Sequence, residues 1–357
     1  DKEKPFMMMY LHKAPHRPWW PSPEKFAEFY EKTFPEPETL FDDYKGRGTA
    51  SKTAEMNILT HMQYMHDSKI RPETLKEMGS VEPEIKYIRG EEVVRPGPNG
   101  FLGPYNRANK EQRSKYNVTL DKINLDFKNN WPNMNDTQKM KWKFQRYMQD
   151  YLGTISSVDD NVGRVLDYLD RNDLTKNTIV VYTSDQGFYL GEHGWFDKRF
   201  IYDESFKTPL LVRWPNEIKP GTTSDEMVQN LDFAQTFLEA AMLEVPDDMQ
   251  GESLMPLLKG NTKDWTREAV YYHYYEYPSV HMVKRHYGII NKEFKLVHFY
   301  YDVNEWELYD RKNDPNEMNN VYSNPDYKEV VEKLTQELKE MRIKYKDSKE
   351  LDESFIY

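Results

Sequence analysis

A short apolar segment near the middle of the chain is followed directly by side chains that can bind a cation. The run Ile179-Val180-Val181-Tyr182 is rich in β-branched residues and predicts a strand buried on both faces. Asp185 and Gln186 come next and offer a carboxylate and an amide oxygen, which are ligands that calcium and magnesium prefer. An alternative interpretation is that Asp185 only caps the turn after the strand, and these residues alone leave both possibilities open.

The loop beyond this turn is crowded with ionisable groups. It ends at a second apolar run, residues 209–212, and contains five ionisable residues: Glu192, His193, Asp197, Lys198 and Arg199. In open α/β sheets, ligands bind where loops converge outside the carboxyl ends of the strands. The sequence therefore predicts an active site at this edge of a sheet.

A second group of basic residues follows another apolar run near the start of the chain. Residues 6–11 predict a further buried strand. Lys13 and His16 lie just beyond it, among prolines that restrict the backbone, and both can donate hydrogen bonds to a tetrahedral anion. Considered alone, this group fits a solvated basic turn better than an anion site. Asp42 and Asp43 follow no buried strand and are interpreted as loop residues, not as a metal pair.

The elements that must position these groups follow from the spacing of apolar residues. A helix is predicted over 137–172, and it leads straight into the strand at 179, an order typical of a parallel sheet. An amphipathic helix over 231–243 is expected to pack on that sheet. Short helices are predicted over 23–33 and 53–65. Residues 80–116 are rich in Gly, Pro and charged residues and predict a long surface insertion.

The last third of the chain predicts a smaller antiparallel sheet. Its expected strands are followed by a charged amphipathic helix over 326–345 and a frayed or loosely docked tail over 347–357; the strands are 269–277, 286–290, 294–300 and 306–309. The predicted fold class is α/β: a mixed sheet between helices, with a smaller C-terminal antiparallel sheet plus helix.

Composition narrows the class of protein. With 357 residues the chain can build a large core and a smaller second domain. Its net charge of −11 argues against an extended nucleic-acid-binding surface but permits a local cationic pocket. The absence of cysteine excludes disulfides, thiol catalysis and thiolate metal sites. No apolar run is long enough to span a membrane and no signal peptide is recognisable, so a mature or trimmed product, or part of one, is expected.

Three short motifs resemble those of the sulfatases in the alkaline-phosphatase-like superfamily. They are Ser184-Asp185-Gln186-Gly187, Gly191-Glu192-His193-Gly194 and the lysine at Lys198. The resemblance implies that Asp185 and Gln186 bind one calcium ion and that Lys198 holds the sulfate ester. Many relatives have Asn or His where this chain has Gln186, but an amide oxygen still suits calcium.

The resemblance extends over almost the whole chain. The turn from Lys13 to His16 matches the family's K-x-P-H turn, which implies that both residues contact the sulfate. Residues 251–258 and 308–317 match two signatures near the family's C-terminal subdomain, which helps to choose the sugar. His16 and His193 are candidates for the general acid. His193 is also a candidate for substrate contact. Four residues of the C-terminal part are further candidates: His273, His281, Arg285 and His286. For each of these four, a packing or surface role is the alternative.

The family's nucleophile is missing from this sequence. Sulfatases of this type use a formylglycine made from Cys or Ser in C/S-x-P/A-x-R, and the chain contains no such motif and no early Asp-Asp metal pair. The resemblance therefore implies a later part of the catalytic domain over 1–262 and a C-terminal subdomain over 263–357. We expect an N-terminal part of the same protein to supply the nucleophile and the remaining calcium ligands, and this chain alone to be inactive and poorly folded.

The expected reaction is hydrolysis of a sulfate monoester on a sugar. The resemblance is closest to bacterial enzymes acting on glycosaminoglycans, and 6-O-sulfated N-acetylglucosamine from a polymer such as heparan sulfate is the expected substrate. Alternatives are a 2-O- or N-sulfatase, a phosphoester hydrolase of the same superfamily, and a non-catalytic sugar-binding paralogue. The expected location is periplasmic or secreted, or lysosomal in a eukaryote.

Overall fold

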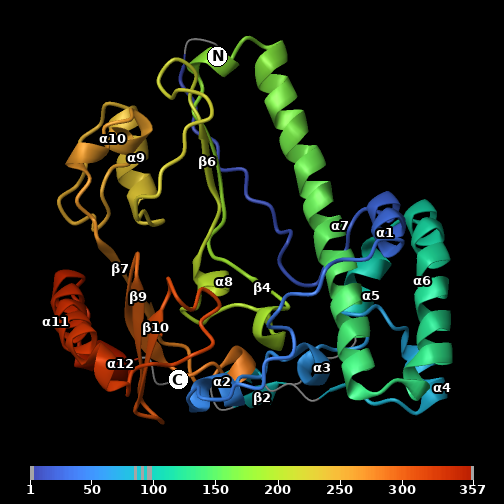
Figure 1. The fold of residues 1–357 in the computed structure, drawn as a ribbon. Helices are drawn as coiled ribbons and strands as arrows, with labels where there is room; N and C mark the ends of the chain where they lie inside the picture. The colour runs from blue at the N-terminus through green and yellow to red at the C-terminus, as the bar shows by residue number, and fades with distance from the viewer. Residues whose placement is uncertain (1–3, 84–86, 90–91, 95–98, 355–357) are drawn as a thin grey trace. The chain divides into compact units, whose positions relative to one another are not determined.

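The computed structural model describes every residue except 1–3, 84–86, 90–91, 95–98 and 355–357. Contacts group the chain into two compact units, whose elements are labelled in Figure 1. The helical unit comprises Asp1–Pro37, Ile58–Glu84 and Pro96–Arg171; the sheet unit comprises Glu38–Asn57, Ile85–Arg95 and Asn172–Tyr357. The predicted domain boundary after residue 262 stays a prediction.

The helical unit packs its helices around an aromatic and aliphatic core. α1 lies against α6 and α7, and Phe26 of α1 is buried with Leu120, Ile123 and Phe127, which recur every three or four positions along α6. The predicted helices over 23–33 and 137–172 are confirmed by α1 and α7. The described elements of this unit are α1 (Pro23–Tyr30), α3 (Ile58–His61), α4 (Pro72–Met78), α5 (Asn99–Arg107), α6 (Lys110–Asn130), η1 (Trp131–Asn133) and α7 (Asp136–Arg171).

The prediction of a surface insertion over 80–116 is wrong for most of the described residues of this segment. This segment contains α5 and the start of α6, and Phe101 and Tyr116 are buried in the core of the helical unit. α6 begins at a capping box in which Asn109 and Gln112 exchange side chain-to-backbone hydrogen bonds of 2.9 and 3.0 Å. The charged residues Lys110, Glu111 and Lys115, part of the pattern that indicated a loop, lie on the exposed face of α6.

Two further predictions near the start of the chain are wrong. Residues 6–11 form no strand, and their apolar side chains are exposed, Leu11 by 79%. A strand needs a neighbour for its backbone hydrogen bonds, and no described residue pairs with this segment. The single helix predicted over 53–65 is replaced by two short ones, α2 (Thr49–Thr53) and α3, separated by residues outside any helix.

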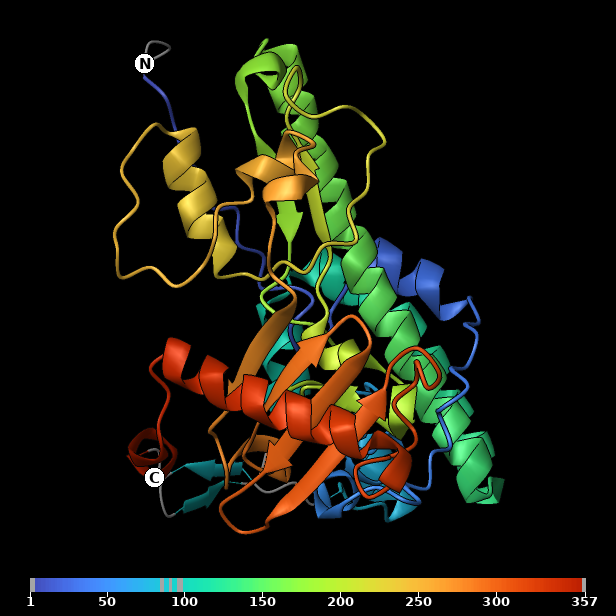
Figure 2. The ribbon, with the colours of Figure 1, turned by 60° about the vertical axis from the view of Figure 1, so that its left-hand side comes forward.

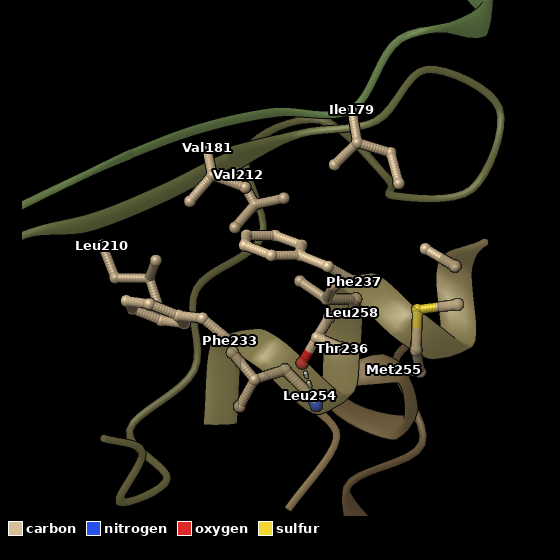
Figure 3. Close-up of a pocket in the computed structure, with 11 residues that line it drawn as sticks. Ile179, Val181, Leu210, Val212, Phe233, Thr236, Phe237, Leu254, Met255 and Leu258 are labelled. Atoms are coloured by element: carbon tan, nitrogen blue, oxygen red, sulfur yellow. Dashed lines mark hydrogen bonds between the residues drawn. The ribbon is translucent and has the colours of Figure 1, made fainter. Parts of the chain in front are cut away.

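In the sheet unit, the strand predicted at 179 is half-buried. β3 (Val180–Thr183) pairs antiparallel with β6 (Leu210–Arg213). One face packs on α9 (Asp232–Ala240) and α10 (Met255–Leu258), and Figure 3 shows Val181 and Val212 turned toward Phe233 and Phe237. The other face is more open, with Leu211 65% exposed. The predicted burial on both faces is therefore wrong, whereas the predicted packing of helix 231–243 on the sheet is confirmed.

The predicted C-terminal sheet is confirmed. Its four strands pair antiparallel in the order β10-β9-β8-β7, and α11 (Lys328–Lys344) crosses one face, as Figure 2 shows. Leu334 and Leu338 of α11 are buried against Ile289, Leu296 and Leu308. The strands are β7 (Ala269–Tyr274), β8 (His286–Asn291), β9 (Phe294–Phe299) and β10 (Glu305–Asp310).

Residues 347–354 of the C-terminal tail are docked and not frayed, and residues 355–357 of the predicted tail lie outside the described residues. Asp347 accepts a hydrogen bond from His273 at 2.7 Å, and Arg342 forms ion pairs with both Asp347 and Asp352. Opposite charges placed on α11 and on the segment after it hold α12 (Lys349–Ser354) against the sheet.

Short elements complete the sheet unit. They are β1 (Tyr87–Arg89), β2 (Glu92–Val94), η2 (Thr175–Asn177), β4 (Tyr189–Leu190), η3 (Glu192–Gly194), β5 (Phe196–Asp197), α8 (Asp203–Phe206), η4 (Thr262–Asp264), η5 (Val280–Met282) and η6 (Pro325–Tyr327). Over both units, the described helices include none with the length and apolar character that crossing a bilayer requires.

Candidate active site

The turn after β3 presents two oxygen donors. Ser184 Oγ donates to the Gln186 carbonyl at 2.8 Å and lies 3.3 Å from Asp185 Oδ1, which fixes the turn locally. Asp185 is exposed and Gln186 is half-buried. Among the residues that the structure describes, no Lys, Arg or His forms an ion pair with Asp185. An exposed carboxylate beside an amide oxygen suits a hard cation such as calcium.

Glycine is required at the end of this turn. A Cβ atom at position 187 would overlap the backbone carbonyl oxygens of Glu204 and Lys207. The Gly187 N–H donates to the Ser205 carbonyl at 2.8 Å, so the turn lies directly on α8. The glycine of the motif is thus explained by a close backbone approach.

Ser205 also holds the loop that contains Lys198. Arg199 N–H donates to Ser205 Oγ at 2.7 Å, while Gly187 bonds to the backbone of the same residue. Lys198 Nζ lies 5.5 Å from the centroid of the Phe188 ring, which follows the turn. The turn that contains Asp185 and Gln186 and the loop that contains Lys198 are therefore both bonded to Ser205. Sequence reasoning missed Ser205, which carries no recognisable pattern of its own.

His193 is a buried anchor of the loop between β4 and β5. Its side chain is fully buried, and its Nδ1 lies 3.0 Å from Asp42 Oδ2, which also pairs with Arg47. The His193 N–H donates to Thr39 Oγ1 at 3.0 Å, and its carbonyl accepts from Tyr44 at 2.8 Å. Because this ring does not reach the surface, the structure assigns it to holding the loop. Asp42 lies in a loop, as predicted, and pairs with His193 and Arg47.

Lys13 and His16 lie on a well-anchored turn of the helical unit. The His16 N–H donates to the Lys13 carbonyl at 2.9 Å, and both side chains are exposed. The next residue, Arg17, is buried and binds both carboxylate oxygens of Asp67, at 2.6 and 2.5 Å. Trp19 Nε1 donates to the Pro15 carbonyl at 2.8 Å. The buried contacts of Arg17 and Trp19 fix this turn, and its two basic side chains, Lys13 and His16, face the solvent.

His281 and His286, candidates for substrate contact in the C-terminal part, are fully buried. His286 Nδ1 donates to the Lys284 carbonyl at 2.7 Å and Nε2 accepts from the Ile201 N–H at 3.2 Å, while burial lowers its pKa to about 3. His281 lies between the Glu55 carbonyl and Asp197, 2.8 Å from each. Both rings position backbone segments and are left out of the substrate contacts proposed below.

Arg285 and His273 also have internal partners. Arg285 is fully buried, and its Nε donates to the Tyr277 carbonyl at 2.9 Å. The side chain of His273 is only 4% exposed; its Nδ1 faces Asp347 and its Nε2 faces the Tyr300 hydroxyl at 2.6 Å. Burial lowers the pKa of His273 despite the neighbouring carboxylate. Neither residue presents a free polar group to a ligand, so both are also left out of the contacts proposed below.

A second cluster has the ligand types of a metal site. One ligand atom from each of His273, Asp347 and Asp352 lies within 4.8 Å of the others. Arg342 already pairs with both carboxylates of this cluster, because its Nη2 lies 2.9 Å from Asp352 and its Nε 3.3 Å from Asp347. A cation bound there would meet the guanidinium, so the cluster is an ion-pair network that holds the tail.

Comparison with protein-family models identifies the chain. The sulfatase model matches residues 1–243, and the model for the C-terminal part of N-sulphoglucosamine sulphohydrolase matches residues 191–344. The chain belongs to the sulfatase family. Its predicted α/β fold, of the alkaline-phosphatase-like type, is confirmed by this match together with the solved structure described below.

Individual relatives agree with this assignment. The chain is 45% identical over 351 residues to an N-acetylglucosamine-6-O-sulfatase of Bacteroides thetaiotaomicron, which covers 98% of this chain and 59% of the relative. It is 41% identical over 109 residues to an N-acetylglucosamine-6-sulfatase of Bos taurus, covering 30% of this chain and 19% of that protein. The chain thus spans about 59% of the length of the bacterial relative.

A solved sulfatase structure superposes on nearly the whole chain. That protein was solved in complex with its substrate, D-glucosamine-2-N,6-O-disulfate. It is 44% identical with a TM-score of 0.88, and the match covers 99% of this chain and 68% of that one.

Proposed function

We propose that this chain forms part of a sulfatase that removes the 6-O-sulfate from N-acetylglucosamine units of a glycosaminoglycan such as heparan sulfate. The observation that carries the proposal is the convergence on Ser205, which joins the Asp185–Gln186 turn to the Lys198 loop. The names of the bacterial and bovine relatives, and the disulfated glucosamine bound by the similar structure, support the choice of sugar and sulfate position.

The residues take distinct roles in this proposal. Asp185 and Gln186 would hold calcium, which when bound supplies positive charge that polarises the sulfate ester. Lys198, with its half-buried ammonium group, and the exposed Lys13 and His16 offset the negative charge that develops on the sulfate oxygens. His16, the exposed imidazole of the two candidates, is proposed as the general acid for the leaving sugar oxygen.

Two side chains cannot complete a calcium site, since calcium takes about 6 to 8 oxygen ligands. We propose that an N-terminal part of the same protein supplies the remaining ligands and a formylglycine nucleophile. The proposed location is periplasmic or secreted, as family membership implies.

The test uses the full-length protein, that is, this chain together with the proposed N-terminal part. Sulfate release is measured from 6-O-, 2-O- and N-sulfated glucosamine saccharides, with and without a calcium chelator. We expect release from the 6-O-sulfated sugars only, and its loss on chelation. Release from another position would refute the substrate, and binding without release would favour the non-catalytic sugar-binding alternative.

Lys198→Ala tests the role of the site in the same assay. We expect turnover to fall about 10²–10³-fold, the range for loss of one group that stabilises developing charge. The matched control is Lys292→Ala, which removes an exposed lysine paired with Glu226 at 3.1 Å. Equal activity of the two variants would remove Lys198 from the site.

A further inference from the structure

The backbone around Lys198 is held in an uncommon conformation. Asp197 has φ 74° and Arg199 has φ 107°, values that residues with side chains rarely adopt. Such geometry persists only where surrounding contacts enforce it, and it is concentrated at functional sites. Here β5 ends at Asp197, and the Arg199 backbone is held at both ends: its N–H by Ser205 Oγ, and its carbonyl by the Tyr272 hydroxyl at 2.7 Å.

Asp197 is the charged residue at the centre of this loop. Its Oδ1 lies 3.6 Å from Lys198 Nζ and 3.0 Å from Arg199 Nη1, and its Oδ2 lies 2.8 Å from His281 Nε2. Burial alone would raise the pKa of Asp197, but Arg199, His281 and Lys198 together hold that pKa well below its usual value. The carboxylate is therefore ionised at neutral pH and attracts the ammonium group of Lys198.

His281 holds this carboxylate from the C-terminal part of the chain. It lies in η5, between β7 and β8, with φ 62° and no exposed surface. Its ring Nδ1 bonds to the Glu55 carbonyl at 2.8 Å, while the Glu55 N–H donates to the His281 carbonyl at 2.7 Å. Because a carbonyl and a carboxylate can only accept, both ring nitrogens act as donors, which requires both to carry protons. Glu55 thus holds both the ring and the backbone of His281, and the second ring nitrogen of His281 restrains Asp197.

We propose that Asp197 and His281 are positioning residues for Lys198: His281 fixes the Asp197 carboxylate, and Asp197 orients the Lys198 ammonium group toward the sulfate. This inference rests on the proposed function. In this proposal, His281 in the segment between β7 and β8 affects the reaction by positioning Lys198 and does not contact the substrate. Misplacement of a catalytic group by about 1 Å can cost about 100-fold in rate, so a rigid link of this kind affects turnover.

The test is a double-mutant cycle in the full-length protein, with kcat and KM measured for a 6-O-sulfated N-acetylglucosamine saccharide. Asp197→Asn removes the charge, keeps the shape and suits a left-handed backbone. We expect it to lower kcat about 10- to 100-fold in the unaltered protein and less than about twofold in a Lys198→Ala background, because interacting residues are not additive. His281→Asn, which also tolerates a positive φ, should behave in the same way.

The outcomes separate positioning from a general structural role. Equal losses of kcat in both backgrounds, or no loss in either, would overturn the inference, since a merely distorted loop would also disturb the metal turn in the Lys198→Ala protein. Glu226→Gln, which alters a half-buried carboxylate paired with Lys292 outside the proposed site, serves as the control and should leave kcat unchanged. Absence of turnover in the unaltered protein would overturn the proposed function and this inference together, whereas turnover with additive losses would overturn the inference alone.

Discussion

Replacement of His286 should remove a defined part of the pH dependence of stability. This ring is fully buried, and burial lowers its pKa from 6.5 to about 3. Between these two values only the unfolded chain binds the proton, so the free energy of unfolding falls as the pH falls. The contribution of neutral His286 is complete above pH 6.5 and decreases steadily down to about pH 3.

The magnitude at pH 5 depends mainly on the unfolded chain. Each pH unit below the ordinary pKa costs about 1.4 kcal/mol, so His286 should account for about 2 kcal/mol of lost stability between pH 8 and pH 5. An error of about one unit in the folded-state pKa leaves this value almost unchanged, since pH 5 is still well above it. His286→Gln keeps a donor for the Lys284 carbonyl and an acceptor for the Ile201 N–H but cannot titrate.

The assay is urea unfolding of the full-length protein at pH 8 and pH 5, followed by tryptophan fluorescence. The unaltered protein should lose about 2 kcal/mol more than His286→Gln between the two pH values. His66, whose pKa burial also lowers to about 3, contributes equally to both proteins and cancels in the comparison. Equal losses of unfolding free energy in the two proteins would refute the buried neutral state of His286. A raised KM of His286→Gln with unchanged stability would instead indicate that His286 contacts the substrate.

Three further outcomes are expected. Gly187→Ala should abolish sulfate release in the assay above, because its Cβ would overlap the Glu204 carbonyl and displace the metal turn; full activity would contradict the required close approach. Arg267→Ala should destabilise the protein by about 3–5 kcal/mol in urea unfolding, because it leaves Asp232 buried without its ion-pair partner, and a loss below about 1 kcal/mol would refute that pairing. Calcium at about 100 times its Kd should stabilise the full-length protein by about 2.7 kcal/mol in thermal shift experiments; Asp185→Ala should abolish this shift, and a shift that persists would place the ion elsewhere.

The family and most of the regular elements could be predicted from local patterns in the sequence. Motifs such as Ser184-Asp185-Gln186-Gly187 are contiguous, and α7, α9, α11 and the strands of the C-terminal sheet follow from apolar spacing within one element. Sequence reasoning failed where local composition was misleading. The charged residues from Lys110 to Lys115 belong to the outer face of α6, and the apolar residues 6–11 have no strand to pair with among the described residues.

Which candidate side chains are buried and which are exposed became clear from the packing of distant segments. His193 and Asp42 are 151 positions apart, and His281 and Asp197 are 84 apart, so no local pattern could reveal that each pair is buried and hydrogen-bonded. A histidine that is a plausible ligand contact by residue type becomes an anchor once its ring nitrogens meet buried acceptors. The folding of the chain between Gly187 and Ser205 likewise made Ser205 the residue that bonds to both the Asp185–Gln186 turn and the loop at Arg199, which no pattern in the sequence indicated.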